Sequence, residues 1–347
     1  MKNLKMITGI ALMAILGFTS CQSEVDEVNG ENPNTNAANS TTAKNFQRTS
    51  AFDGSSDDFI DGNSCTSVIL PATATVNGTK VTLFSQLDYA QVISILGQFN
   101  NDQDTVVLQF PLKVKMSNYT EVAVNSQAEY NAIVNACTAA QSSGQSAISS
   151  LNITFPITIL TYNVSLVQTG SVVITSEKEL YTYMSNVSST ELFSVKYPMS
   201  VTLIDGTKTT VSSDSEFQAA INASLKAEAT MKAAAENSKK LETILVNGKF
   251  KVESFLTAGA NTASNYKDYT VDFANNLSVT AASTLSSTVN GTYAVSSQLE
   301  VFLKLSFSGN ATFNLLNNTW KVTSFNATSI SLQSTTNAAV TVVLKQI

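Results

Sequence analysis

The 347-residue sequence contains no histidine, and this absence removes several kinds of chemistry at once. Without an imidazole there can be no Ser-His-Asp or Cys-His nucleophile, no histidine general base and no histidine-ligated zinc. A glycine-rich phosphate loop and a Gly-x-Ser-x-Gly nucleophile turn are missing as well. We therefore expect a protein that is not an enzyme and that holds no metal and no cofactor.

Charge is also scarce, because only 13% of the residues are charged and the net charge is −6. Nucleic-acid phosphates are bound by clustered lysine and arginine, and no such cluster appears, which argues against a nucleic-acid partner. Pairs of acidic residues do occur, at Asp57/Asp58, Asp102/Asp104 and Glu177/Glu179. General acid–base catalysis needs carboxylates held across a cleft, whereas these lie in expected loops or at a helix start. We assign no catalytic residue.

Long apolar runs are absent except at the start of the chain. Lys2 and Lys5 precede the apolar run Met6–Phe18, and small residues follow up to Cys21. This order is typical of a bacterial lipoprotein signal peptide over residues 1–20, cleaved so that the Cys21 thiol carries diacylglycerol. A membrane-spanning helix needs about 20 apolar residues, and no later segment supplies them. The sequence thus predicts an exported protein that contacts the membrane through its N-terminal lipid.

Residues 21–63 are rich in Asn, Thr and Ala and poor in apolar residues, so we expect a disordered, acidic tether. The acidic run 53–62 lacks the Asp-x-Asx-x-Asx-Gly spacing of a calcium loop and is interpreted as a solvated linker. Glu24, Asp26 and Glu27 follow Cys21 closely, which resembles the surface-export signal of Bacteroidetes-type lipoproteins. That resemblance implies an outer-membrane protein exposed on the cell surface, with an anchor facing the periplasm as the alternative.

Residues 64–228 repeat one pattern four times: a proline within alternating apolar residues, an expected hairpin, and a Ser-x-x-acid box that opens a helix. The prolines are Pro71, Pro111, Pro156 and Pro198. Because the residues three positions before and after each proline are apolar, we predict a strand that runs through the proline with one buried face. Proline cannot donate to a sheet, so an edge or a bulge is expected there. The pattern predicts four ββα units.

Each predicted helix begins with the same pair of residue types. The serine hydroxyl caps the first turn and the acid three residues later reaches back, an arrangement worth about 1 kcal/mol. The pairs are Ser85/Asp88, Ser126/Glu129, Ser176/Glu179 and Ser213/Glu216. A single apolar stripe follows each box, as in a helix with one buried face. We interpret all eight residues as structural.

Two cysteines remain once Cys21 is assigned to lipid. Cys137 falls on the buried stripe of the second predicted helix, and Cys65 lies where the first strand begins. In an oxidising compartment such a pair predicts a disulfide that joins the first two units. Two buried free thiols are the alternative.

The helix of the fourth unit continues through an Ala/Lys/Glu-rich coupling segment, 229–245, into a region of period-two strands, 246–347. The expected strands are 248–256, 267–273, 276–283, 287–296, 299–308, 319–325, 328–334 and 338–346. Eight short antiparallel strands favour a closed up-and-down barrel, with a β-sandwich as the competing architecture. The fold class is therefore α+β.

The motif order in this last region carries a resemblance. Gly-Lys-Phe-Lys-Val at 248–252, Asn-Gly-Thr-Tyr at 290–293 and Leu-Leu-Asn-Asn-Thr-Trp-Lys-Val at 315–322 are similar to the lipocalin-like domains that end many Bacteroidetes lipoproteins. The proline-centred units resemble N-terminal regions of uncharacterised lipoproteins of that group. Phe250 stands where such barrels usually begin with Trp. The resemblance implies a fold and a location and brings no activity with it.

Three classes of function follow from these observations. We favour an interaction or structural module on the cell surface, whose partner is a surface protein or a glycan. The alternative is a carrier or sensor that holds a small apolar ligand in the barrel, and an enzyme is disfavoured. Asp104-Thr105-Val106 also resembles the Asp-Ser/Thr-apolar acceptor of Bacteroidetes O-glycosylation, so Thr105 is a candidate modification site.

Overall fold

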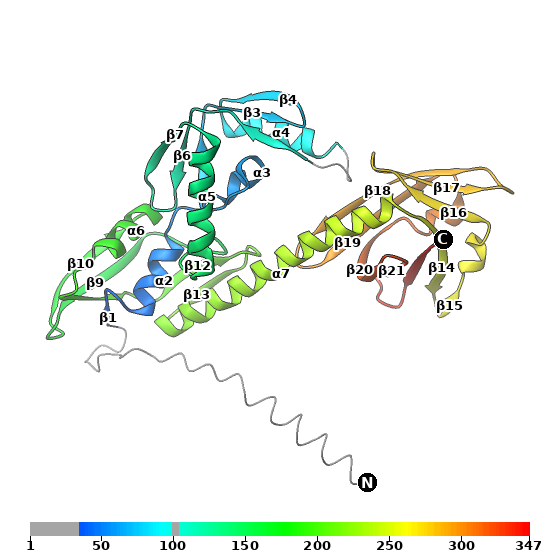
Figure 1. Cartoon of the computed structure of the whole chain (residues 1–347). Helices are drawn as coiled ribbons and strands as arrows, with labels where there is room; N and C mark the ends of the chain where they lie inside the picture. Colours follow the sequence, from blue (N-terminus) through cyan, green and yellow to red (C-terminus); the bar gives the residue numbers. More distant parts are fainter. Residues whose placement is uncertain (1–34, 99–103) are drawn as a thin grey trace, which may run out of the picture. The chain divides into compact units, whose positions relative to one another are not determined.

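A computed structural model describes residues 35–98 and 104–347 of the chain, which form two compact units. Among the described residues, the smaller unit comprises 35–47 together with Phe155–Tyr197, and the larger one comprises those of Arg48–Thr154 and of Pro198–Ile347. The signal peptide, Cys21 and the acids that follow it lie outside the described residues. Figure 1 colours the hairpin units cyan to green and the barrel yellow to red.

The hairpin–helix order predicted from the sequence occurs four times. The first two units are β3 (Ala72–Val76), β4 (Thr79–Leu83) and α4 (Tyr89–Leu96), then β6 (Leu112–Met116), β7 (Glu121–Val124) and α5 (Gln127–Ser142). The last two are β9 (Ile157–Asn163), β10 (Gln168–Ile174) and α6 (Glu177–Asn186), then β12 (Met199–Leu203), β13 (Lys208–Val211) and α7 (Asp214–Val246). A short 3-10 turn, η2 (Gln86–Asp88), precedes α4.

The prediction of one strand through each proline is wrong, because the chain changes sheet there. Separate short strands precede the four prolines: β2 (Thr66–Ile69), β5 (Val106–Leu108), β8 (Leu151–Ile153) and β11 (Glu191–Val195). Each pairs with the hairpin of another unit: β2 with β6, β5 with β3, β8 with β12 and β11 with β9. Proline lacks the N–H that would continue a ladder, so it stands between two strands rather than within one.

The exchange of strands follows one register in all four cases. In each case the residue three positions before the proline of one unit pairs with the residue three positions after the proline of the partner unit. These pairs are Val68 with Val114, Leu108 with Ala74, Ile153 with Val201, and Val195 with Ile159. All eight side chains are buried. The first and second units thus form one exchanging pair, and the third and fourth form another.

Residues 35–63 are folded, which corrects the expectation of a disordered tether for this part of it. They contain β1 (Asn36–Ala37), α2 (Thr41–Thr49), η1 (Ser55–Asp57) and α3 (Asp58–Asp61). β1 pairs with β11, and the ring of Phe46 on α2 is fully buried. Few apolar residues suffice here because they pack against sheets that are already present, which composition alone does not reveal.

The C-terminal region is a closed antiparallel barrel, as predicted. Its strands are β14 (Lys249–Thr257), β16 (Tyr269–Phe273), β17 (Ser278–Ser283), β18 (Val289–Ser297), β19 (Val301–Ser308), β20 (Asn318–Asn326), β21 (Ser329–Ser334) and β22 (Thr341–Gln346). Each pairs with the next in the chain, and β14 also pairs with β22, which closes the ring and excludes the sandwich. Short elements β15 (Ala260–Asn261), η3 (Ala263–Tyr266) and α8 (Ala311–Asn314) lie in its connections.

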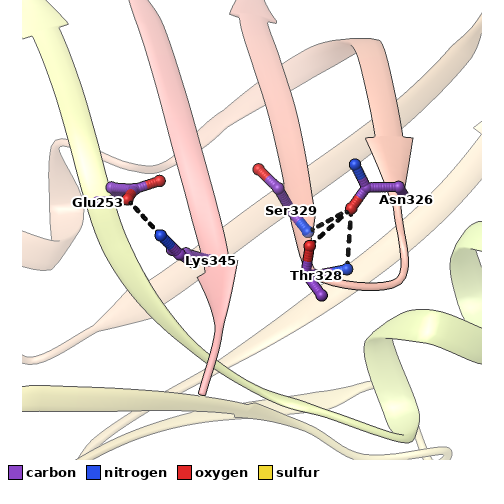
Figure 2. Close-up of polar contacts among 5 residues, drawn as sticks. All are labelled: Glu253, Asn326, Thr328, Ser329 and Lys345. Atoms are coloured by element: carbon purple, nitrogen blue, oxygen red, sulfur yellow. Dashed lines mark hydrogen bonds and ion pairs between the residues drawn. The ribbon is translucent and has the colours of Figure 1, made fainter.

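The seam between the first and last barrel strands carries an exposed ion pair. Glu253 lies where the register of β14 shifts, and its carboxylate accepts from Lys345 Nζ on β22 at 3.0 Å (Figure 2). In the adjacent turn, Asn326 Oδ1 accepts from the backbone N–H groups of Thr328 and Ser329 at 2.9 and 3.0 Å. An exposed pair contributes about 0–1 kcal/mol, so closure depends on the ladder and on the buried side chains.

Candidate functional site

A serine begins each of the four helices of the hairpin units and hydrogen-bonds to its first turn. The N–H groups of Glu129, Glu179 and Glu216 donate to the serine three residues earlier at 3.2–3.3 Å. Asp88 completes a capping box with Ser85. The role of these residues is structural.

The acidic residues of the four caps accept hydrogen bonds from different backbone N–H groups. Asp88 Oδ2 accepts from the N–H of Ser85 at 2.9 Å and from that of Phe84 at 2.8 Å. Glu179 Oε2 accepts instead from the hydroxyl and from the N–H of Thr175, the residue before the serine, both at 2.7 Å. These bonds lower the pKa of Asp88 and of Glu179. Glu179 is therefore committed to the helix start and is no partner for Glu177 in proton transfer.

Cys65 and Cys137 are joined by a disulfide, with their Cα atoms 6.0 Å apart. Asn63 lies beside it, where its amide donates to Thr66 Oγ1 at 3.0 Å and to the sulfur of Cys137 at 3.8 Å. The bond connects the strand region of the first unit to α5 of the second. It therefore acts between the two units that exchange strands.

Three aspartates surround this junction, although the sequence analysis had placed them in a solvated linker. Asp57 is fully buried, and its Oδ2 accepts from the N–H of Val68 at 2.7 Å. Asp58 accepts from the hydroxyl of Ser64 at 2.6 Å, and Asp61 accepts from the N–H of Asn63 at 3.0 Å. These carboxylates cap the backbone of a folded turn and connect it to β2.

Burial controls the protonation of this cluster. It raises the pKa of Asp57 and of Asp58, and it raises the pKa of Asp61 to about 7, with the charge of Asp57 adding to the effect. The hydroxyl of Tyr130 donates to the backbone carbonyl of Asp61 at 2.9 Å. In the described ranges, no group of three or more His, Cys, Asp or Glu residues is arranged to hold a metal ion.

Thr105 is exposed and directly precedes β5. Its N–H donates to Asn77 Oδ1 at 2.8 Å, and the Asn77 amide donates to the carboxylate of Asp104 at 2.8 Å. Asn77 thereby ties the Asp-Thr motif to the turn of the first hairpin. Asp102, the other acid of that pair, lies outside the described residues.

The barrel interior is filled with aromatic and aliphatic side chains. Buried rings meet edge to face, as in Phe250 with Phe273 at 5.8 Å and Phe273 with Tyr293 at 5.1 Å between centroids. Trp320 is 1% exposed and its indole N–H donates to the carbonyl of Leu316 at 2.9 Å. These side chains belong to the hydrophobic core of the barrel.

A groove lies between α7, the turn from β18 to β19, and β20. One part has a volume of about 910 Å³ and contains Lys240 and the ion pair of Lys321 with Glu300. A neighbouring part of about 660 Å³ is lined by Ala223, Ala227, Leu299 and Phe302, among others. The sequence analysis did not predict this groove, because it depends on how the helix packs on the barrel.

Large apolar side chains are exposed at the first hairpin unit. Phe84, directly after β4, is 75% exposed and Leu87, on η2, is 86% exposed. The three other units have polar or small residues at the equivalent positions. These are Asn125, Thr175 and Ser212 for Phe84, and Ala128, Lys178 and Ser215 for Leu87. The comparison within the chain shows that the fold does not require apolar residues there.

The comparisons with known proteins say little about this chain. No family model matches the sequence, and no curated protein matches it. Among solved structures, it is similar to a DUF4847 family protein from Bacteroides vulgatus ATCC 8482, known from a crystal structure at 1.00 Å resolution. The sequences are 12% identical, the match covers 30% of this chain and 96% of that chain, and the TM-score is 0.25. Within the described ranges, none of the helices is both long and apolar enough to cross a membrane.

Proposed function

We propose that this protein is a non-enzymatic interaction module held at the outer membrane by a lipid on Cys21. Its barrel serves as a filled structural domain, and its hairpin–helix units present the binding surface. The observation that supports this most directly is the pair of apolar side chains, Phe84 and Leu87, exposed where the fold itself accepts polar residues. An exposed apolar group that no structural need explains is typical of a contact surface.

A protein partner is favoured over a glycan. Glycan sites usually depend on exposed aromatic platforms, and the single tryptophan of this chain, Trp320, is buried in the barrel. The exposed pair at the first unit instead offers an aromatic and an aliphatic anchor, which suits a protein surface.

Photo-cross-linking on intact cells tests the proposed surface. A photoreactive amino acid replaces Leu87 in one variant and Lys178, its equivalent in the third unit, in the control. We expect an adduct of defined mass from position 87, reduced when Phe84→Asn is added, and none from position 178. Equal labelling at both positions, or no adduct at either, would contradict the proposed surface.

The membrane anchor is tested separately. We expect Cys21→Ser to release the protein from the outer-membrane fraction, because a lipid on that thiol is the proposed attachment. Protease added to intact cells distinguishes the two orientations, since only a surface-exposed chain is digested. Retention of the Cys21→Ser protein in the membrane would reject the lipid anchor.

Thr105 remains a proposed site of O-glycosylation. The residue is exposed before β5, and its hydroxyl makes a long hydrogen bond, to Asn77 Oδ1 at 3.5 Å, which a transferase would displace. We expect the intact mass of the protein from its native host to exceed that of the polypeptide and to fall to the polypeptide mass in Thr105→Val. An unchanged mass excess in the variant would place the modification elsewhere.

The groove beside α7 supports a second proposed function, namely binding of a small apolar ligand between α7 and the barrel strands. Its apolar part, with Ala227 and Phe302, is the observation in favour. Native mass spectrometry of the Cys21→Ser protein, purified without detergent, should show a bound mass that Ala227→Trp removes by filling the groove. An empty wild-type protein would reject this function.

A further inference from the structure

The edge strand β10 has a feature that the other hairpin units lack. It is the terminal strand of the sheet β1-β11-β9-β10 in the smaller unit, and among the described residues it pairs only with β9. Its seven residues, Gln168–Ile174, include no charged residue and no proline. Unprotected edges of this kind pair readily with another strand.

The unpaired backbone groups of β10 can be identified from its neighbours. Lys196 N–H donates to the carbonyl of Thr158 at 2.8 Å, so Thr158 on β9 directs its backbone groups toward β11. Val173, which lies opposite Thr158, must then direct its own N–H and C=O away from the sheet. Ser171, two residues earlier and opposite Leu160, does the same.

The equivalent edges of the other three units are shorter and charged. The strand β4 has five residues and contains Lys80, β7 has four and contains Glu121, and β13 has four and contains Lys208. Charged residues and short length are the usual protections of a sheet edge. The strand β10 has exposed valines and no charged residue: Val172 is 37% and Val173 is 60% exposed.

We propose that β10 pairs antiparallel with β10 of a second copy of this chain, across a twofold axis at Val172. In this register Ser171 lies opposite Val173 of the second copy, and each exchanges its outward N–H and C=O with the other. The twofold axis repeats this pair, so the contact contains four backbone hydrogen bonds. The sheets of the two copies then form one continuous antiparallel sheet.

The ends of β10 determine this register. On one side the pairing with β9 shifts between Gln168 and Gly170, which marks a bulge that disrupts a regular edge. On the other side the N–H of Thr175 donates to Glu179 at 2.7 Å and is not available to another strand. Only Ser171 and Val173 remain as a regular outward pair, and this pair is complementary to itself.

A second copy is the occupant that the residues favour. An uncharged edge meets an identical edge without repulsion, whereas a symmetric pair of β4, β7 or β13 would bring together two like charges from Lys80, Glu121 or Lys208. The contact also covers Val172 against Val172 of the second copy, and Val173 against Ser171 of the second copy. This proposal goes beyond the proposed function, since self-association at β10 and partner binding at Phe84 and Leu87 use different residues.

Sedimentation equilibrium of the Cys21→Ser protein over a dilution series tests the dimer without association caused by lipid. We expect a reversible dimer for this protein and for Val107→Lys, a control at a similarly exposed valine (56%) on the edge strand β5. Val173→Lys should raise the dimer Kd at least tenfold. A monomer at every concentration, or a dimer that Val173→Lys leaves intact, would overturn the proposal.

Cysteine cross-linking tests the register. Val172 of the two copies forms a directly opposed pair without hydrogen bonds, in which Cα atoms lie about 4.5 Å apart, within the range of a disulfide. Oxidation of Val172→Cys should therefore give a covalent dimer. Val173→Cys, which faces Ser171 of the second copy, should not. A covalent dimer from Val173→Cys and none from Val172→Cys would overturn the assigned register, whatever the outcome for the partner at Leu87.

Discussion

At the scale of single residues, Asp61 should make the stability of the protein depend on pH. Its folded-state pKa of about 7 lies above its ordinary value of 3.8, so the folded protein holds a proton that the unfolded chain releases. This stabilisation is complete below the unfolded pKa and is lost as pH rises through about 7. We expect urea unfolding to show a lower free energy of unfolding at pH 8 than at pH 5.5. The raised pKa values of Asp57 and Asp58 change the free energy of unfolding with pH in the same direction.

Asp61→Asn should remove most of this dependence. The amide keeps the shape of the side chain and carries no charge, so we expect the variant to exceed wild type by about 1–3 kcal/mol at pH 8 and to match it more closely at pH 5.5. The same substitution at an exposed position, Asp268→Asn, is the control. A loss of stability in Asp61→Asn at both pH values would show that the ionised carboxylate is needed.

Gly54 is a second residue whose identity the fold requires. A Cβ atom there would lie 1.9 Å from the backbone carbonyl oxygen of Thr66, although the backbone conformation at φ −88° suits any residue. We expect Gly54→Ala to lower the free energy of unfolding by about 1–3 kcal/mol, seen as a lower Tm, because two backbone segments must separate. Gly97→Ala, with φ −90° and its nearest contact at 3.2 Å, is the matched control and should lose less stability. Equal losses in both variants would contradict the steric explanation.

Burial of single residues was the feature of this structure that the sequence predicted best. The apolar residues three positions either side of each proline were expected on a buried face, and all eight are buried. Cys137 was expected on the buried stripe of its helix and is buried on α5. The aspartates at 57, 58 and 61 were misread because their partners, such as the N–H of Val68, lie in another element. Sequence spacing reports periodic burial well and reports contacts of irregular turns poorly.

At the scale of elements, the Cys65–Cys137 disulfide should stabilise the exchanging pair formed by the first two units. It closes a loop of 72 residues, which in a chain-entropy model contributes about 4 kcal/mol. We expect thiol titration of the denatured, unreduced Cys21→Ser protein to find no free thiol. The double variant Cys65→Ala, Cys137→Ala should unfold at lower denaturant concentration. Two free thiols per chain would contradict the bond.

The exchange of strands shows why element boundaries were harder to predict than element types. A period-two pattern continues through Pro71 or Pro156 without interruption, so the sequence reads as one strand. The pattern is kept because both halves bury the same face, even though they join different sheets. The choice of partner sheet depends on long-range pairing, which no local propensity encodes. The barrel strands were placed more accurately because each pairs with its neighbour in the chain.

At the scale of the whole molecule, Trp320 offers a way to observe the barrel alone. It is the only tryptophan in the sequence and is buried in the barrel, while the disulfide lies among the hairpin units. The helix α7 contributes Phe217 and Ile221 to buried positions near its start, and Leu241 and Leu245 to the barrel core. Trp320 fluorescence can therefore show whether destabilising the hairpin units also destabilises the barrel through α7.

We expect reduction of the disulfide to lower the unfolding midpoint measured by far-ultraviolet circular dichroism and to leave the midpoint of Trp320 fluorescence unchanged. The reason is that the barrel has its own closed ladder and its own buried core. Leu241→Ala is the converse variant, because it removes a fully buried side chain from that core. It should lower the free energy of unfolding followed by Trp320 fluorescence by about 2–5 kcal/mol. If reduction shifted both signals equally, the hairpin units and the barrel would unfold as one cooperative body, and α7 would be the element that couples them.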